Sequence, residues 1–278
     1  MRIPTLQQLL EAGVHFGHRV SRGNPRMRQF IYGVRDGVHI IDLEQSEKGL
    51  KEAVDFVKEL GKNGKVLLFV GTKKQAQGIV EEVAKSVGAP FMCSRWIGGF
   101  LTNFEEILKN IKKLKELKQA KSKGELNKYT KKEQLLIDRR VAQLTRDLGG
   151  VQDLTEIPDS LFVVDGAREI VALREAKRTG VKVVAIADTN SDPLLIDYPI
   201  PGNDDAIKSI KILVETIGAA YGEGKKEAGK IAVKKEEERV KEEAKLAKEA
   251  AEQVAEEVAE AEEEIEKKSV EESERKVE

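Results

Sequence analysis

The feature that most constrains the fold is a repeating succession of short apolar runs and longer amphipathic segments. In 46–61, for example, apolar residues recur every three or four positions until Gly61, which is the pattern of a helix and its end. Strands that alternate with helices of this length predict βαβ units, and hence a parallel sheet with helices on both faces, a three-layer α/β sandwich. The predicted strands are 37–43, 65–71, 90–94, 160–165 and 181–188, and the predicted helices are 46–61, 75–88, 168–180 and 204–222.

A long insertion separates the predicted strands 90–94 and 160–165. It opens with RWIGGF, which holds the chain's only tryptophan, and continues as two amphipathic segments interrupted by GELNKY. Thr102 with Glu105, and Thr130 with Glu133, have the spacing of capping boxes at two helix starts. Heptad-like stripes predict that the two helices form an antiparallel coiled-coil hairpin. The stripe residues are Ile107, Ile111, Leu114 and Leu117 in the first helix, and Ile137, Val141, Leu144 and Leu148 in the second.

The two ends of the chain differ from this α/β pattern. Residues 5–12 predict a short helix with a capping box of Thr5 and Gln8, and the Gly-, Pro- and Arg-rich segment after it predicts an ordered loop. The last 56 residues contain no aromatic residue, and their narrow apolar stripe cannot build a core. We expect a solvated helix or a fluctuating extension there. The predicted domains are the α/β body over 1–102 and 150–222, the hairpin over 103–149 and the tail over 223–278.

Signals for the cellular compartment are few. No apolar window approaches the length of a membrane span, and the N-terminus lacks the apolar region of a secretory signal. The single cysteine, Cys93, cannot form an internal disulfide, and its apolar neighbours predict that it packs as a small buried hydrophobe. These features predict a cytosolic protein.

Positive charge is concentrated in the body of the chain. Residues 223–278 carry 13 Lys and Arg against 20 Asp and Glu, whereas residues 1–222 carry 35 against 29. Arginines cluster before residue 30, two lysines follow the predicted strand 65–71, and ten lysines with only two acids lie between positions 109 and 132. Such patches favour a polyanion partner, and Arg95 and Trp96 could stack on bases. We therefore predict RNA binding through phosphate, 2′-OH and stacking contacts.

Two less specific interpretations of these residues stay open. A lysine-rich helix can be a merely solvated face, although here only two glutamates lie among the ten lysines and leave most of their charge unbalanced. Trp96 could instead be a plug that anchors the root of the hairpin to the sheet.

Catalytic signatures are weak. The GTKK that follows the strand 65–71 lacks the GxxxxGK[ST] frame of a P-loop, and no GxGxxG follows any predicted strand. The three histidines, His15, His18 and His39, match no zinc motif. We therefore predict a protein that is not an enzyme. Two alternatives remain: a nucleotide-dependent α/β enzyme that uses the loops at the sheet's carboxyl end, and a scaffold whose hairpin or tail grips another protein.

The segment IADTNSDPLLIDYPIPGNDDA gathers five aspartates. A carboxylate cluster can hold Mg²⁺, but Asn203 and the two aspartates after it stand where a helix is predicted to start, where such residues commonly serve as caps. We expect no metal site and no cofactor, with a structural Mg²⁺ as the alternative. The aspartates are Asp188, Asp192, Asp197, Asp204 and Asp205, and whether Asp188 and Asp204 hold an ion together with His18 is left open by the sequence.

Eight motifs carry a specific resemblance. They are LLEAGVHFGH (9–18), NPRM (24–27), GVHIIDL (37–43), FVGTKKQA (69–76), RWIGGFLTNF (95–104), IPDSLFVVD (157–165), IADTNSDP (186–193) and IDYPIPGNDDA (196–206). In this order, over residues 1 to about 221, the chain resembles the bacterial family of small-subunit ribosomal protein two. The resemblance implies a non-catalytic cytoplasmic protein that binds small-subunit ribosomal RNA between head and body, contacts neighbouring ribosomal proteins, and helps to dock ribosomal protein one.

The same resemblance implies which residues contact RNA. The candidates are Arg19, Arg22, Arg26, Arg28, Lys73, Lys74, Arg95, Trp96, Lys109, Lys112 and Lys113. Two positions depart from the family pattern. Many relatives carry an aromatic residue where this chain has Gly23, so a stacking or packing contact there is in doubt. Thr or Met is common in place of Phe100, which puts the packing of the Trp loop in doubt.

Overall fold

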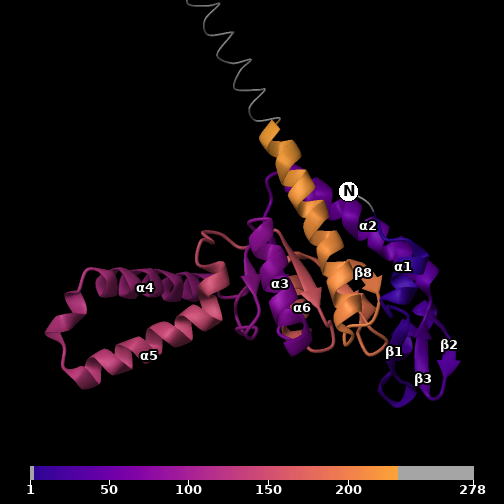
Figure 1. Cartoon of the computed structure of the whole chain (residues 1–278), viewed down its shortest axis with the longest axis horizontal. Coiled ribbons are helices and arrows are strands. Elements are labelled where there is room, and N and C mark those ends of the chain that lie inside the picture. The colour runs from indigo at the N-terminus through magenta and orange to yellow at the C-terminus, as the bar shows by residue number, and fades with distance from the viewer. Residues whose placement is uncertain (1–2, 231–278) are drawn as a thin grey trace, which may run out of the picture. The chain divides into compact units, whose positions relative to one another are not determined.

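The computed structural model describes residues 3–230, apart from the side chains at positions 127 and 128. It contains a five-stranded parallel sheet of order β5-β4-β6-β7-β8 and a separate antiparallel sheet of order β1-β3-β2 (Figure 1). The parallel sheet and the helices around it confirm the predicted α/β sandwich. No helix in this part of the chain has the length and apolarity to cross a membrane. Most of the predicted tail, from residue 231, lies outside the described residues.

In the α/β body, the observed strands and helices alternate much as the sequence predicts. The strands are β1 Phe16–Arg19, β2 Ile31–Arg35, β3 Val38–Ile41, β4 Leu67–Val70, β5 Phe91–Met92, β6 Ser160–Val164, β7 Lys182–Ala187 and β8 Tyr198–Pro201. The α-helices are α1 Leu6–Glu11, α2 Leu43–Lys62, α3 Lys74–Ser86, α4 Phe104–Ser122, α5 Lys131–Leu148 and α6 Ile170–Thr179, and residues 207–230 are also helical. Short 3-10 turns are η1 Val20–Arg22, η2 Pro25–Phe30, η3 Glu125–Lys128, η4 Gly149–Val151 and η5 Pro193–Leu195.

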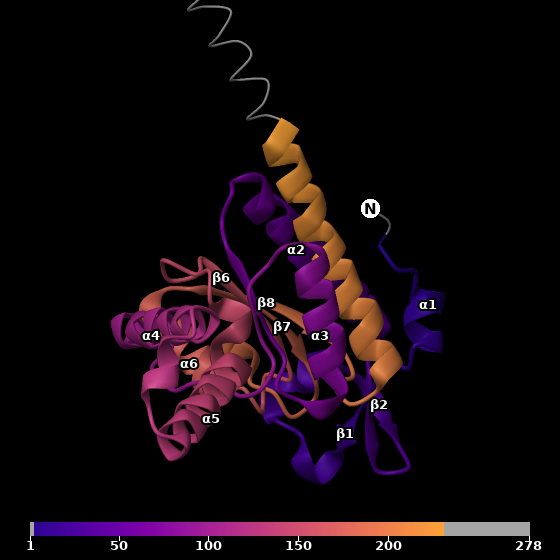
Figure 2. The same ribbon diagram turned by 60° about the vertical axis from the view of Figure 1, so that its left-hand side comes forward.

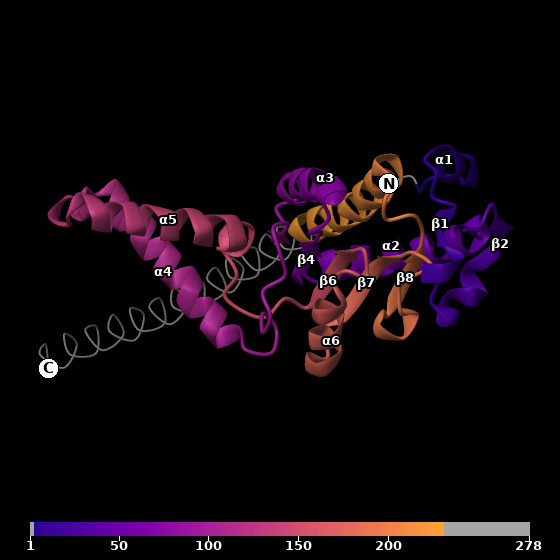
Figure 3. The same cartoon turned by 90° about the horizontal axis from the view of Figure 1, so that it is seen from below.

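The central strands send alternate side chains into two apolar cores. In β4, Leu67 and Phe69 enter one core, while Leu68 and Val70 enter the other. The first core is closed by α2, α3 and the helix 207–230, and the second by α6 with the roots of α4 and α5. Figure 3 shows α3 and α6 on opposite sides of the sheet. Burial on both faces explains why these strands read as continuous apolar runs.

Two sequence predictions about strands are wrong, and one strand was not predicted. The segment 37–43 does not join the parallel sheet, because β3 pairs with β1 and β2 in the small antiparallel sheet. The Arg-rich segment before it is not a loop: it forms β1, η1, η2 and β2. Finally, β8 arises from YPIP, which the sequence analysis did not assign to a strand. Prolines are compatible with β8 because it is an edge strand, where a missing N–H costs no ladder bond.

Most of the expected local signals are present. The capping boxes of Thr5 with Gln8 and of Thr130 with Glu133 both form. Cys93 packs against the first core, and burial raises the pKa of its thiol to about 12, as suits a small hydrophobe. The predicted box of Thr102 with Glu105 is wrong, because α4 starts after Asn103 without a side-chain cap.

Helices α4 and α5 follow one another with η3 between them and pack together (Figure 2). Their apolar side chains join the second core: Ile107, Ile111 and Leu114 from α4 are buried with Leu144 and Leu148 from α5. The heptad-like stripe therefore faces inward near the sheet. Its extension into a coiled coil stays a prediction.

Leu144→Asp is expected to lower the free energy of unfolding by about 3 kcal/mol, because it places an unpaired charge where a leucine is 5% exposed. Circular dichroism during urea denaturation measures the change. Leu136→Asp on the same helix is the matched control, since Leu136 is 55% exposed and its replacement should change stability by less than about 0.5 kcal/mol. Equal stability of the two variants would contradict the assigned packing of α5.

Helix 207–230 crosses α2 at two glycines. A Cβ atom on Gly224 would lie 2.2 Å from the carbonyl oxygen of Lys58, and one on Gly61 would lie 2.7 Å from that of Tyr221. Lys58 Nζ also lies 2.9 Å from Glu227 Oε1. The two backbones therefore touch where a larger residue could not fit, and the helix continues beyond the predicted end at residue 222.

Candidate functional site

The arginine segment lies on β1 and the two 3-10 turns after it. Arg19, Arg22, Arg26 and Arg28 are all exposed. The backbone is fixed beneath them, because Asn24 N donates to the carbonyl of residue 189 at 2.7 Å and the Asn24 side chain accepts from Arg26 N. The segment is thus an ordered surface that carries four guanidinium groups.

The Arg26 guanidinium forms an ion pair within the protein. Arg26 Nη1 lies 2.6 Å from Asp192 Oδ2, so part of its charge is already balanced within the protein. Because both side chains are partly exposed, this ion pair contributes little stability, on the order of 1 kcal/mol or less. It does fix the direction of the Arg26 side chain.

Lys73 and Lys74 differ in exposure although they are adjacent. Lys74 begins α3 and is exposed, whereas Lys73 is buried with its Nζ 2.6 Å from both Asp204 Oδ1 and Asp205 Oδ1. Nζ also lies 3.2 Å from Asp165 Oδ2. The ammonium of Lys73 therefore neutralises carboxylates inside the protein, while Lys74 is the lysine of this pair that faces solvent.

The Trp loop is held by one buried carboxylate on α6. Glu175 accepts hydrogen bonds from Trp96 Nε1 at 3.1 Å, Gly99 N at 2.8 Å and Leu101 N at 3.0 Å. Its second oxygen also accepts from the backbone N–H of Thr102, the residue expected to cap α4. Trp96 is partly buried against the second core. These contacts match the interpretation of Trp96 as an anchor, and base stacking by Trp96 stays a prediction.

Arg95 and the α4 lysines are the exposed cations near this loop. Arg95 is exposed, and its Nη2 lies 3.6 Å from the buried Asp147. Lys109 lies 2.6 Å from Glu106, one turn back on α4, while Lys112 and Lys113 are exposed. Farther along α4, two lysines pair with carboxylates outside the helix, Lys115 with Asp153 and Lys121 with Asp138 of α5. Lys118 donates a hydrogen bond to the neutral amide of Gln152.

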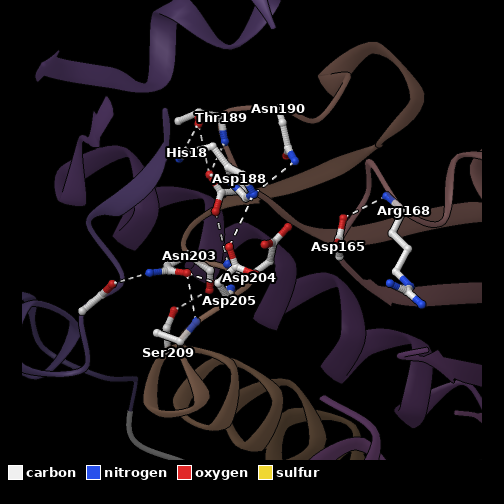
Figure 4. A network of polar contacts seen from close by, with 12 residues as sticks. His18, Asp165, Arg168, Asp188, Thr189, Asn190, Asn203, Asp204, Asp205 and Ser209 are labelled. Carbon is white, nitrogen blue, oxygen red and sulfur yellow. Dashed lines mark hydrogen bonds and ion pairs between the residues drawn. The ribbon is translucent and has the colours of Figure 1, made fainter. Parts of the chain in front are cut away.

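The carboxyl ends of the parallel strands meet the end of β1 in a polar network (Figure 4). Asp165 follows β6, Asp188 follows β7, Asp204 comes after β8, and His18 belongs to β1. His18 Nδ1 lies 3.1 Å from Asp188 Oδ1, and Asp204 N donates to Asp188 Oδ2 at 3.3 Å. Asp165 has a φ of 72°, a conformation that residues other than glycine rarely adopt. Chain segments far apart in the sequence are thus tied together at the edge where α/β proteins commonly place ligands.

The remaining polar residues of the segment 186–206 act as local caps and ion-pair partners. The Asp192 side chain caps η5. Asp197 Oδ1 lies 2.7 Å from Lys182 Nζ, and Asn203 Oδ1 accepts from Ala206 N at the start of the last helix. The capping role expected for Asn203 is confirmed.

Burial and neighbouring charges shift the pKa values of several groups in this network. Burial together with the Asp188 and Asp165 carboxylates raises the pKa of Asp204 to about 7. The pKa of His18 is raised because the Asp188 carboxylate outweighs burial, which acts in the opposite direction. Burial also favours the neutral amine of Lys73, but its hydrogen bond to Asp204 and the surrounding carboxylates outweigh that effect and raise its pKa. Both the raised pKa of Asp204 and the raised pKa of His18 reflect carboxylates that lie close together in a buried place.

Comparison with known proteins identifies the family. The sequence profile of the family described as ribosomal protein S2 matches residues 9–224. The chain belongs to the ribosomal protein S2 family. Its relatives include proteins named small ribosomal subunit protein uS2 from a Nitratiruptor species, 48% identical over 80% of this chain and 83% of the relative, and from Coprothermobacter proteolyticus, 49% identical over 81% and 84%. The protein of that name from Helicobacter hepaticus is 46% identical over 80% of this chain and 84% of its own length.

Membership of the ribosomal protein S2 family confirms the resemblance found in the sequence. It makes the chain a structural, non-enzymatic protein, so the nucleotide-dependent enzyme alternative is set aside. The two departures from the family pattern have local explanations. A Cβ atom on Gly23 would lie 2.6 Å from His39 Nε2, so the His39 ring fills the space beside it. Phe100 is fully buried, with its ring centroid 5.2 Å from that of Trp96.

Two important residues were missed by sequence reasoning. Glu175 looked like one charged residue among several on α6, and its position on the buried face of that helix was the available signal. Asp165 ends an apolar strand, and no spacing in the sequence pairs it with Lys73. A carboxylate directly after a buried strand is the pattern that could have drawn attention to it.

Proposed function

We propose that this protein is a structural constituent of the small ribosomal subunit in the cytoplasm and that it binds small-subunit ribosomal RNA through its exposed arginines and lysines. Membership of the ribosomal protein S2 family and the names of its relatives support the ribosomal part of the proposal. One observation carries the RNA part: exposed cations lie on separately anchored elements, in the arginine segment, at the start of α3, in the Trp loop and on α4. Rigid cationic surfaces of this kind suit a folded polyphosphate.

Each basic group has a distinct part in the proposed contact. The planar forks of Arg22 and Arg28 are suited to bind phosphate oxygens in pairs. Lys112 and Lys113 are point charges on flexible stems, so they contribute attraction with less geometric demand. Lys73 takes no direct part in this version of the interface, because its ammonium is satisfied by carboxylates. Its contribution is to hold the surface in place.

Affinity for small-subunit ribosomal RNA is expected to fall about a thousandfold between 50 and 200 mM monovalent salt, if about six phosphates are neutralised. Filter binding or fluorescence anisotropy with the purified RNA at constant free Mg²⁺ measures this dependence. An affinity that stays within about threefold over the same salt range would remove the phosphate-contact proposal.

Two matched double variants test whether RNA affinity depends on where the positive charges lie or only on their total number. Arg22→Ala with Arg28→Ala should weaken RNA binding and reduce the salt slope by about two, one unit for each phosphate that is no longer neutralised. The control is Lys48→Ala with Lys62→Ala, which removes the same charge from exposed positions on α2. If both double variants lose affinity equally, binding depends on net charge and not on the arginine segment.

We also propose that this protein helps to dock ribosomal protein one, through the apolar surface formed by α1 and the small sheet. Leu10 and Tyr32 are 51% and 82% exposed, and with Leu6 they line an open cavity of about 410 Å³. Exposed apolar groups that gather in one place commonly mark a protein interface. Leu10→Lys with Tyr32→Lys should abolish co-sedimentation of protein one with small subunits while the variant itself still assembles. Retention of protein one would place its docking elsewhere.

A further inference from the structure

The side chains of His18, Asp188 and Asp204 converge although they come from β1 and from the segments that follow β7 and β8. Each offers one nitrogen or carboxylate oxygen, and the three atoms all lie within 4.8 Å of one another. Ligand atoms bound at about 2.1 Å to one cation lie about 3 to 4.2 Å apart. A contraction of about half an ångström would therefore bring the three atoms onto one ion. Figure 4 shows the three side chains directed toward one another.

Asp204 has an oxygen that nothing in the described part of the chain satisfies. Its side chain is fully buried, and Oδ1 accepts from Lys73 Nζ, but Oδ2 has no hydrogen-bond partner among residues 3–230. A buried carboxylate oxygen without a partner destabilises the folded protein, because it has lost its hydration without gaining a hydrogen bond. An oxygen in this position is therefore a candidate ligand atom.

His18 has a second atom of the same kind. Its Nδ1 lies 3.1 Å from Asp188 Oδ1 without a well-aligned hydrogen bond to any of the residues described, while its Nε2 lies 3.5 Å from Asn190 Nδ2 and 3.4 Å from Asp205 Oδ2. A nitrogen and an oxygen about 3 Å apart that are not hydrogen-bonded have the separation of two neighbouring ligands on one cation. The separation of these two atoms is therefore compatible with an ion bound by both.

The carboxylates of the network also favour a bound cation on electrostatic grounds. Three carboxylates, from Asp165, Asp204 and Asp205, contact the ammonium of Lys73, and the fourth, from Asp188, lies beside His18 and accepts from Asp204 N. Buried carboxylates require compensation by a cation or by hydrogen bonds. A divalent ion beside Asp188 and Asp204 would balance the charge that Lys73 leaves uncompensated.

We propose that His18, Asp188 and Asp204 form a structural binding site for a divalent first-row transition metal, Zn²⁺ above all. An imidazole nitrogen favours Zn²⁺ over Mg²⁺ or Ca²⁺, which prefer oxygen ligands alone. Neighbouring groups orient the ligands: Thr189 N and Oγ1 donate to Asp188 Oδ1, and Lys73 holds the far oxygen of Asp204. The ion would tie β1 to the ends of β7 and β8. This proposal does not depend on RNA binding.

The test is calorimetric titration of the full-length protein, stripped of metal with a chelator, with ZnCl₂ and separately with MgCl₂. We expect one Zn²⁺ per chain, at least about tenfold tighter than Mg²⁺, and a melting temperature that rises with Zn²⁺ concentration as linkage requires. Asp204→Asn keeps the shape of the side chain but removes the ligand charge, and it should weaken Zn²⁺ binding by about 100-fold. No stoichiometric Zn²⁺ binding by the wild-type protein would overturn the proposal.

The matched control is Asp197→Asn, which makes the same chemical change in the same segment at a carboxylate that pairs with Lys182. It should bind Zn²⁺ like the wild type, whereas equal loss in both variants would show that the ion binds elsewhere. Should Asp204→Asn fail to fold, zinc K-edge X-ray absorption of the wild-type protein decides the matter. One imidazole nitrogen with oxygen ligands at about 2.0–2.2 Å is expected, and two or more imidazoles or a sulfur ligand would overturn the assignment.

Discussion

Lys73→Met should lower the free energy of unfolding by about 4 kcal/mol, although the new side chain is nearly as long and more apolar. The ammonium lies 2.6 Å from Asp204 Oδ1, and its removal leaves a fully buried carboxylate beside that of Asp165 without their cation. Breaking one side of a buried ion pair typically costs about 3–5 kcal/mol, because the remaining charge stays desolvated. Denaturant unfolding in the presence of a chelator measures the loss, so that a bound metal ion cannot mask it.

The neighbouring lysine provides the control for this experiment. Lys74→Met removes the same charge one position along the chain, from an exposed side chain, and should change stability by less than about 0.5 kcal/mol. A Lys73→Met protein as stable as Lys74→Met would show that the carboxylates at the sheet edge do not need this lysine. It would also return Lys73 to the set of candidate RNA contacts.

Glu175→Ala is expected to release the Trp loop and to lower the free energy of unfolding by about 4 kcal/mol. The variant removes the acceptor of Trp96 Nε1 and of the backbone N–H groups of Gly99 and Leu101. Each buried donor left without a partner costs about 1–3 kcal/mol. Because Trp96 is the only tryptophan, its fluorescence reports on this loop alone. A red shift of the emission before global unfolding is the expected result.

Two further substitutions on α6 sharpen this prediction. Glu175→Gln keeps one acceptor oxygen but turns an NH₂ group toward one of the donors, so its loss of stability should be intermediate. Arg174→Ala removes the exposed neighbouring side chain and should leave both the emission and the stability unchanged. An unshifted emission in Glu175→Ala would mean that core packing alone holds Trp96.

The sequence was sufficient for the body of the fold because its signals there are local and agree with one another. The apolar runs of β4, β6 and β7 and the stripes of α2, α3 and α6 each indicate the correct element without reference to the rest of the chain. The antiparallel sheet was missed because β1 and β2 are short and Gly-containing, and their pairing with β3 has irregular register. Only β3, within the predicted strand 37–43, carried an apolar run that distinguished it from a loop.

The functional residues were harder to predict because their environment is made by distant segments. Lys73 and Lys74 are equivalent in the sequence, and only the return of β6 and β8 to the same edge buries one of them. Thr102 and Glu105 have the correct spacing for a capping box, but the Thr102 backbone instead donates to Glu175, 73 residues away. Spacing along the chain cannot reveal such competition. The arginines, by contrast, could be singled out from the sequence because their charge and glycine neighbours are local properties; they are exposed, and RNA contact by them stays a prediction.

The glycine crossing of α2 with the last helix determines how the chain can be shortened. Composition placed the start of the tail at residue 223, but Gly224 fits against the Lys58 carbonyl and Glu227 reaches the Lys58 ammonium. A protein truncated after residue 222 would lose these contacts between α2 and helix 207–230. Truncations designed to test the function of the acidic tail should therefore retain all residues through 230. Otherwise a folding defect could be mistaken for the loss of a binding partner.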